Sequence, residues 1–151
     1  VMMLVEQILL ISSKIVPVVL AVVLLYFLAE DRKKLLLYII SVLCVALFTY
    51  GLKYTVDAPR PDDAAWDKNT ARFPSGHTSL VFVPFLFIGL WKYRFPYLGY
   101  SALVAYSRLY FNLHIPVDVI AGAAIGIVVP FIVFRYKERI LGTTEKFLER
   151  F

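Results

Sequence analysis

The sequence contains little charge and a single cysteine. Lysine, arginine, aspartate and glutamate make up 18% of its 151 residues, whereas hydrophobic residues make up 60% and the mean hydropathy is +0.74. This composition excludes an ordinary soluble globular domain and indicates a protein of the lipid bilayer. Cys44 lies inside an apolar run and has no second cysteine with which to form an intramolecular disulfide. We interpret it as a packing residue that indicates nothing about the redox compartment.

Linkers, repeats and processing signals are missing as well. No Ser/Gly-rich tract, low-complexity segment or internal repeat divides the chain. We therefore predict one membrane-embedded domain over residues 1–151. No basic segment precedes the first apolar run and no small-residue cleavage site follows it, so we do not expect a cleaved signal peptide.

Apolar runs separated by clusters of charge fill the rest of the sequence. They predict an all-α integral membrane bundle of about five transmembrane helices, over residues 8–29, 35–56, 77–91, 96–112 and 116–134. The first run is either one span or an interfacial helix around Glu6 to Lys14 followed by a span, because its polar residues share one face. The third run has a length of about 22 Å, shorter than the roughly 30 Å hydrocarbon core. We therefore expect its first turn to lie near an interface.

Lysine and arginine are divided unequally between the two sides of such a bundle. If each run crosses the membrane once, one side carries ten of these residues: Arg32, Lys33, Lys34, Lys92, Arg94, Arg135, Lys137, Arg139, Lys146 and Arg150. The other side carries six: Lys14, Lys53, Arg60, Lys68, Arg72 and Arg108. The majority predicts that the first side is cytoplasmic. The net charge of +5 then follows from topology, the basic tail is a membrane-surface anchor, and we expect no nucleic-acid partner.

Polar and ionisable residues gather at predicted helix ends on the non-cytoplasmic side. Ionisable groups at membrane depth cost about 2.5–3.5 kcal/mol each at the centre and less toward the interface, so several together predict a functional site. The group consists of Lys53, Arg60, Ser75, Gly76, His77, Ser107, Arg108, His114 and Asp118.

Three motifs contain these residues. Lys53 to Pro61 reads K-x6-R-P, residues 74–77 read P-S-G-H, and Ser107 to Asp118 reads S-R-x5-H-x3-D. In this order and spacing they resemble the signature of the type 2 phosphatidic acid phosphatase (PAP2) superfamily, which also includes vanadium haloperoxidases. All eleven specified positions match. Bacterial members usually carry six spans, so the count of five leaves the packing at the N-terminus open.

The two histidines of the motifs have complementary chemistry. If the helix that begins near Pro116 reaches back, Asp118 accepts a hydrogen bond from Nδ1–H of His114 and leaves Nε2 as a nucleophile that attacks phosphorus. His77, at the start of the third run, then protonates the leaving group and later deprotonates the attacking water. This chemistry requires no metal and no cofactor. The cations nearby lower the pKa of His114 while Asp118 raises it, and we expect activity from mildly acidic to neutral pH.

The remaining motif residues suit phosphate binding. Lys53, Arg60 and Arg108 place positive charge around the equatorial oxygens of the transition state. Gly76 permits close approach of the backbone at the start of a helix, and Ser75 offers a hydroxyl donor.

The resemblance and the apolar surroundings together imply a phosphorylated membrane lipid as substrate. We expect a metal-independent lipid phosphatase of the plasma membrane whose active site faces the extracytoplasmic side. A polyprenyl diphosphate such as undecaprenyl diphosphate is the leading substrate, with phosphatidylglycerol phosphate, phosphatidic acid and lipid A phosphate as alternatives. A lipid phosphotransferase, a vanadate-dependent haloperoxidase and a catalytically silent lipid-binding protein are the competing functions. The sequence leaves the oligomeric state open, a homo-oligomer included.

Overall fold

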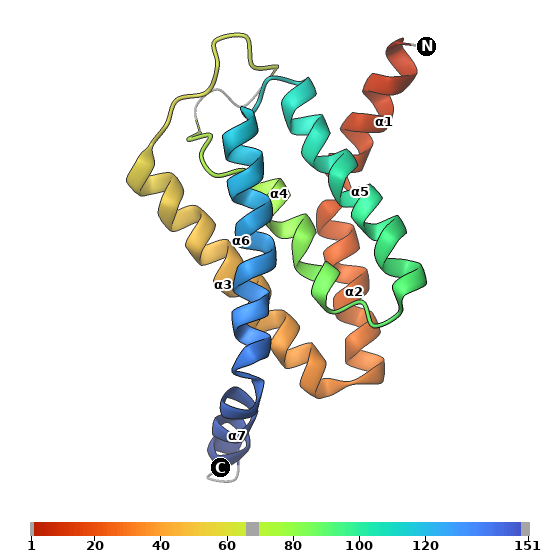
Figure 1. Ribbon diagram of the computed structural model, residues 1–151, viewed down its shortest axis with the longest axis vertical. Helices are drawn as coiled ribbons and strands as arrows, with labels where there is room; N and C mark the ends of the chain where they lie inside the picture. The colour runs from red at the N-terminus through yellow and green to blue at the C-terminus, as the bar shows by residue number, and fades with distance from the viewer. Residues whose placement is uncertain (1, 66–69, 149–151) are drawn as a thin grey trace.

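The computed structural model describes residues 2–65 and 70–148 and arranges them as a helical bundle (Figure 1). Within those ranges the chain contains no β-strand, in agreement with the predicted all-α class. The elements are α1 (Met2–Lys14), α2 (Val16–Glu30), α3 (Arg32–Val56), α4 (Gly76–Phe82), the 3-10 helix η1 (Val83–Leu86), α5 (Trp91–Tyr110), α6 (Pro116–Arg135) and α7 (Lys137–Leu148).

The long apolar helices make this a membrane protein by length and composition. Helices α3 and α6 are each long and apolar enough to cross a bilayer, and α1 with α2 forms a third span if the pair is counted as one. That pair is bent by 45°, so the first predicted run is two helices and begins before residue 8. The break lies at Ile15, just before Pro17 in the first turn of α2, which has no N–H to continue the hydrogen bonds of α1.

The third and fourth predicted runs have different boundaries in the structure. Helix α4 ends at Phe82 and continues only as η1, because Pro84 cannot donate to the helical ladder. Helix α5 begins at Trp91 and includes the charged residues that we expected in a turn. Arg94 is accommodated there because its Nε donates to the Ile88 carbonyl at 2.6 Å and its guanidinium lies 5.3 Å from the Trp91 ring centroid.

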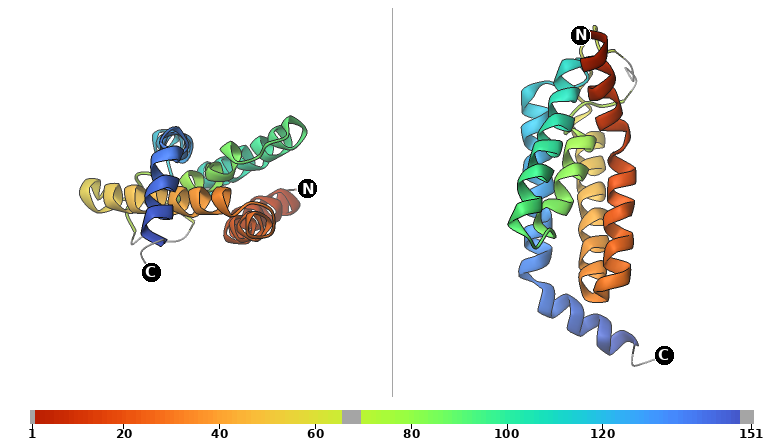
Figure 2. Two further views of the ribbon diagram at one scale, coloured as in Figure 1. Left: turned by 90° about the horizontal axis from the view of Figure 1, so that it is seen from below. Right: turned by 90° about the vertical axis from the view of Figure 1, so that its right-hand side faces the viewer.

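The ends of four helices meet at one end of the bundle, as the motifs predict. The end of α3, the start of α4, the end of α5 and the start of α6 lie together at the top of Figure 1, and the α2–α3, α4–α5 and α6–α7 connections lie toward the other end. Helix α7 runs across the bundle axis there (Figure 2). Lys68 and Arg150, which entered the charge count, lie outside the described residues.

Close contact between α4 and α6 fixes the position of the third motif block against the second. The two helices meet at Gly122 and Gly126, where an added Cβ atom would lie 2.6 Å from the Ser75 carbonyl oxygen and against the Ser79 carbonyl oxygen, respectively. Gly122 and Gly126 form a G-x-x-x-G pattern, which here allows two helices of the same chain to pack closely. Ser79 Oγ also donates to the Ser75 carbonyl at 2.9 Å, which satisfies the hydroxyl at this crossing.

Gly126→Ala is expected to destabilise the fold by about 1–3 kcal/mol, because the methyl group would collide with backbone atoms of α4 that cannot rotate away. Thermal unfolding in detergent measures this loss. Gly51→Ala is the matched control, since Gly51 is also helical and an added Cβ there meets nothing within 4 Å. Equal melting temperatures for the two variants would contradict the packing.

Candidate active site

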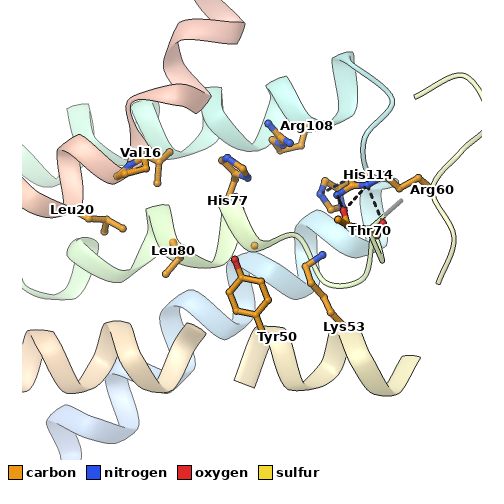
Figure 3. A pocket seen from close by; sticks show the side chains of 12 residues that line it. Val16, Leu20, Tyr50, Lys53, Arg60, Thr70, His77, Leu80, Arg108 and His114 are labelled. Atoms are coloured by element: carbon orange, nitrogen blue, oxygen red, sulfur yellow. Dashed lines mark hydrogen bonds between the residues drawn. The ribbon is translucent and has the colours of Figure 1, made fainter. Parts of the chain in front are cut away.

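A pocket of about 380 Å³ lies where the four helix ends meet. Six of the eight predicted site residues line it: Lys53, Arg60, Gly76, His77, Arg108 and His114. Figure 3 shows Lys53 on α3, His77 on α4 and Arg108 on α5, with His114 beside Arg60. The other two predicted residues, Ser75 and Asp118, are buried and do not line the pocket.

His114 is held in the short connection between α5 and α6. The backbone N–H groups of Leu113 and His114 both donate to the Arg108 carbonyl, at 3.1 and 3.2 Å, and Asn112 adopts a left-handed conformation with φ 51°. The side chain of His114 is 2% exposed. Its Nε2 lies 3.4 Å from Arg60 Nη1, and this arrangement turns the nitrogen that we predict to be nucleophilic toward the pocket cations.

Asp118 faces the opposite nitrogen of the imidazole. Its Oδ2 lies 3.5 Å from His114 Nδ1, a separation longer than an ordinary hydrogen bond. Nδ1 accordingly forms no hydrogen bond in the described part of the chain. The carboxylate therefore has the predicted orientation, but the contact is looser than predicted because other donors already bind its oxygens.

Those donors are a backbone amide and an arginine that the sequence analysis did not assign to the site. Asp118 Oδ2 accepts from the Ile115 N–H at 3.0 Å, which caps the start of α6. Arg72 Nη1 donates to Oδ1 at 3.0 Å and to Oδ2 at 3.1 Å. In the sequence, Arg72 is one of six basic residues on the side of the bundle that carries fewer lysines and arginines. This placement was the feature that could have indicated Arg72 as a site residue.

Two of the pocket cations, Arg60 and Lys53, are anchored by backbone carbonyls. Arg60 donates through Nη1 to the Leu113 carbonyl and through Nε and Nη2 to Thr70. Lys53 Nζ donates to the Ala71 carbonyl. Because these carbonyls belong to the segments that flank the pocket, the positive charges are held in place in the absence of substrate, as electrostatic stabilisation of a phosphoryl transition state requires.

Burial and positive charge together control the protonation of His114. Burial is the larger cause, followed by Arg60, Arg108, Lys53 and His77, and all of them lower the pKa of His114 well below its ordinary value. The sequence left open whether the cations or Asp118 has the larger effect on the pKa of His114. In the structure the pKa is lowered, which favours the neutral imidazole, the form that carries a nucleophilic lone pair.

The start of α4 brings Gly76 and His77 into the pocket but turns Ser75 away from it. The Ser75 side chain is fully buried, and its hydroxyl lies 2.9 Å from Thr78 Oγ1. Its backbone N–H donates to the Asp118 carbonyl at 3.0 Å. In this structure Ser75 therefore connects α4 to α6, and its hydroxyl does not face the pocket.

The wall of the pocket on the α2 side is apolar. Val16, Pro17 and Leu20 from α2 and Leu80 from α4 line it on this side, and Tyr50 and Thr70 complete the lining. A second, apolar hollow of about 210 Å³ lies between α2 and α3 and shares Leu20 with the first. The site therefore presents cations and imidazoles on one side and hydrocarbon surface on the other, an arrangement that suits an amphipathic phosphate ester.

Comparisons with known proteins agree with this geometry. A family model described as the PAP2 superfamily matches residues 34–141. The fold is similar to the crystal structure of Aquifex aeolicus LpxE, with a TM-score of 0.77 and 26% sequence identity over 88% of this chain and 87% of that one. No curated protein sequence matches the chain.

Proposed function

Because the chain belongs to the PAP2 superfamily and is accordingly a lipid phosphatase, we propose that it hydrolyses a polyprenyl diphosphate through a phospho-histidine intermediate, without a metal ion. The observation that carries this proposal is the two-sided pocket, in which His114 and three cations face an apolar wall from α2 and α4. A phosphate headgroup fits the charged side, while a hydrocarbon chain remains in contact with the wall and the bilayer.

The proposed reaction has two displacements. His114 Nε2 attacks the terminal phosphorus of the diphosphate and an N–P bond forms. The bond from that phosphorus to the bridging oxygen breaks, and the lipid monophosphate leaves while His77 gives a proton to the leaving oxygen. His77 then takes a proton from water, the water oxygen attacks phosphorus, and the N–P bond breaks to release inorganic phosphate. Lys53, Arg60 and Arg108 stabilise the charge on the equatorial oxygens in both steps.

We propose further that this single domain crosses the plasma membrane five times with the site on the extracytoplasmic side. The placement of the α2–α3, α4–α5 and α6–α7 connections away from the pocket supports this topology. The excess of lysine and arginine at the helix ends beside those connections favours their placement in the cytoplasm. In this topology α4, continued by η1, makes the third crossing and packs against α6, and α5 makes the fourth and packs against α1 and α4.

Other headgroups and another acceptor are the alternatives. Phosphatidylglycerol phosphate, phosphatidic acid and lipid A phosphate present the same phosphate chemistry to the cations. Transfer of the phosphoryl group from His114 to an alcohol, instead of to water, gives a lipid phosphotransferase and requires room for an acceptor beside the roughly 380 Å³ pocket. We favour hydrolysis, because a pocket of this size holds a headgroup and water.

Phosphate release by the purified protein in detergent, with a chelator present, tests the proposal. The assay compares undecaprenyl diphosphate, phosphatidylglycerol phosphate, phosphatidic acid and lipid A with a water-soluble phosphate ester. We expect the fastest release from the polyprenyl diphosphate and inhibition by vanadate, which mimics five-coordinate phosphorus. Preference for another lipid would correct the substrate, and folded protein that is silent on all of them would favour transfer to an acceptor.

A further inference from the structure

We infer that Arg72 is a positioning residue of the phosphatase site, which acts by holding the Asp118 carboxylate against His114. This inference rests on the proposed nucleophilic role of His114. It adds a fourth basic residue to the site, one that lies outside all three motifs and serves the nucleophile instead of the substrate.

The contacts of Arg72 connect three segments that are distant in the sequence. Its Nη1 binds both oxygens of Asp118 on α6. Its Nε donates to the Pro59 carbonyl at 2.8 Å, and its backbone N–H donates to the Ala58 carbonyl at 2.9 Å. The side chain of Arg72 is 23% exposed, so these contacts lie in a partly dry environment.

Asp118 needs such a partner because it is almost fully buried. Only 1% of its side chain is exposed, and a buried carboxylate without a counter-charge is strongly unfavourable. His114 does not supply that charge, since its imidazole is kept neutral and lies 3.5 Å away. Arg72 Nη1 donates to both oxygens of the carboxylate, and together with the Ile115 N–H, which donates to Oδ2, it holds the carboxylate in the orientation that directs Oδ2 toward the imidazole.

This orientation matters most when charge develops on the imidazole. Attack on phosphorus makes His114 cationic, and the Oδ2 atom of an already oriented Asp118 then faces the positive Nδ1–H without reorganisation. The same guanidinium holds Pro59, the residue before Arg60, whose Nη1 lies 3.4 Å from His114 Nε2. Arg72 thus positions the groups on both sides of the imidazole.

Arg72 is distinguished from a substrate ligand by its place outside the pocket lining. Its Nε and Nη1 atoms are directed at Pro59 and Asp118. Loss of Arg72 should consequently slow the chemical step while substrate binding is retained. A direct phosphate ligand would instead weaken binding when removed.

Steady-state kinetics on a double-mutant cycle tests the inference. We expect Arg72→Gln to lower kcat about 10–100-fold, as for outer partners that orient a reacting group, with KM changed by less than about threefold. In the Asp118→Asn background the same substitution should change kcat by less than about twofold, because the carboxylate it orients is gone. Arg72→Lys should recover part of the activity, since lysine keeps the charge without the forked geometry. Arg94→Gln is the matched control, an arginine whose Nε also binds a backbone carbonyl but which lies at the other end of the bundle.

Nitrogen-15 NMR of the histidine side chains gives a second readout that requires no turnover. The chain has two histidines, so His77→Ala assigns both signals. We expect the wild-type His114 to carry its proton on Nδ1. Arg72→Gln should shift the nitrogen resonances of His114, whereas Arg94→Gln should leave them unchanged. Arg72→Lys replaces Arg72→Gln if the glutamine variant does not fold. Three results would overturn the inference. The first is that the His114 resonances do not change. The second is that Arg72→Gln lowers kcat by the same factor in the Asp118→Asn background as in the wild type, and the third is that Arg72→Gln raises KM alone. If the wild-type protein shows no phosphatase activity, the proposed function fails, and the NMR result alone decides whether Arg72 positions Asp118 against His114.

Discussion

Replacement of His114 by alanine is expected to lower phosphate release by at least about 1,000-fold, because removal of a covalent nucleophile leaves only the catalysis supplied by binding and charge stabilisation. Lys53 and Arg60 are anchored by backbone carbonyls, so they should remain in place and continue to bind the lipid. The measurement is kcat in detergent at saturating substrate, alongside equilibrium binding of vanadate.

A trapped intermediate makes this expectation specific to nucleophilic attack. Wild-type protein mixed briefly with substrate labelled in its phosphate and then denatured should retain label on histidine, and His114→Ala should retain none. The near-isosteric His114→Gln controls for the space that alanine opens at a residue whose side chain is only 2% exposed. Label that persists in both variants would assign the nucleophile to another residue.

His77→Ala is expected to produce the second largest loss, about 100- to 10,000-fold, the range contributed by a general acid and base. The loss should be greatest for substrates with poor leaving groups, since these depend most on protonation of the departing oxygen. A substrate with an acidic leaving group, such as nitrophenyl phosphate attached to an alkyl chain, should be affected least. An equal loss for both kinds of substrate would contradict the role of His77 as the acid.

The pH profile separates the two histidines in the same experiment. Burial, and then the surrounding cations, lower the pKa of His114, so its neutral form predominates to acidic pH and nucleophilic attack is not lost there. The pH dependence of kcat in the wild type should therefore belong to His77. We expect His77→Ala to flatten that profile, and a profile that the substitution leaves unchanged would contradict this assignment.

The sequence predicted the pocket residues well because two independent patterns agree. Motif spacing identified Lys53, His77 and His114, and hydropathy placed all three at helix ends on one side of the bundle. Two such constraints leave little freedom, since helix ends on one side of a bundle must lie close together. The six pocket-lining residues followed from this agreement.

Features that depend on a single residue were not predictable in the same way. The break at Ile15 and the end of α4 at Phe82 lie next to Pro17 and Pro84, whose local effect on the helix is not visible in the hydropathy of a continuous apolar run. The Ser75 hydroxyl turns toward Thr78 because of packing between α4 and α6. Arg72 lies in a connecting segment, where neither a motif nor a helical spacing relates it to Asp118 in the sequence. The two residues come into contact only in the folded chain.

The apolar wall formed by Val16, Leu20 and Leu80 also bears on the kinetics of the protein. A substrate that reaches the cations while its chain lies along this wall arrives by diffusion in the plane of the membrane. Its effective concentration is then a mole fraction among lipids, so diluting it with inert lipid or detergent slows turnover even when its bulk molarity is constant. The apparent KM of this phosphatase is accordingly a surface density.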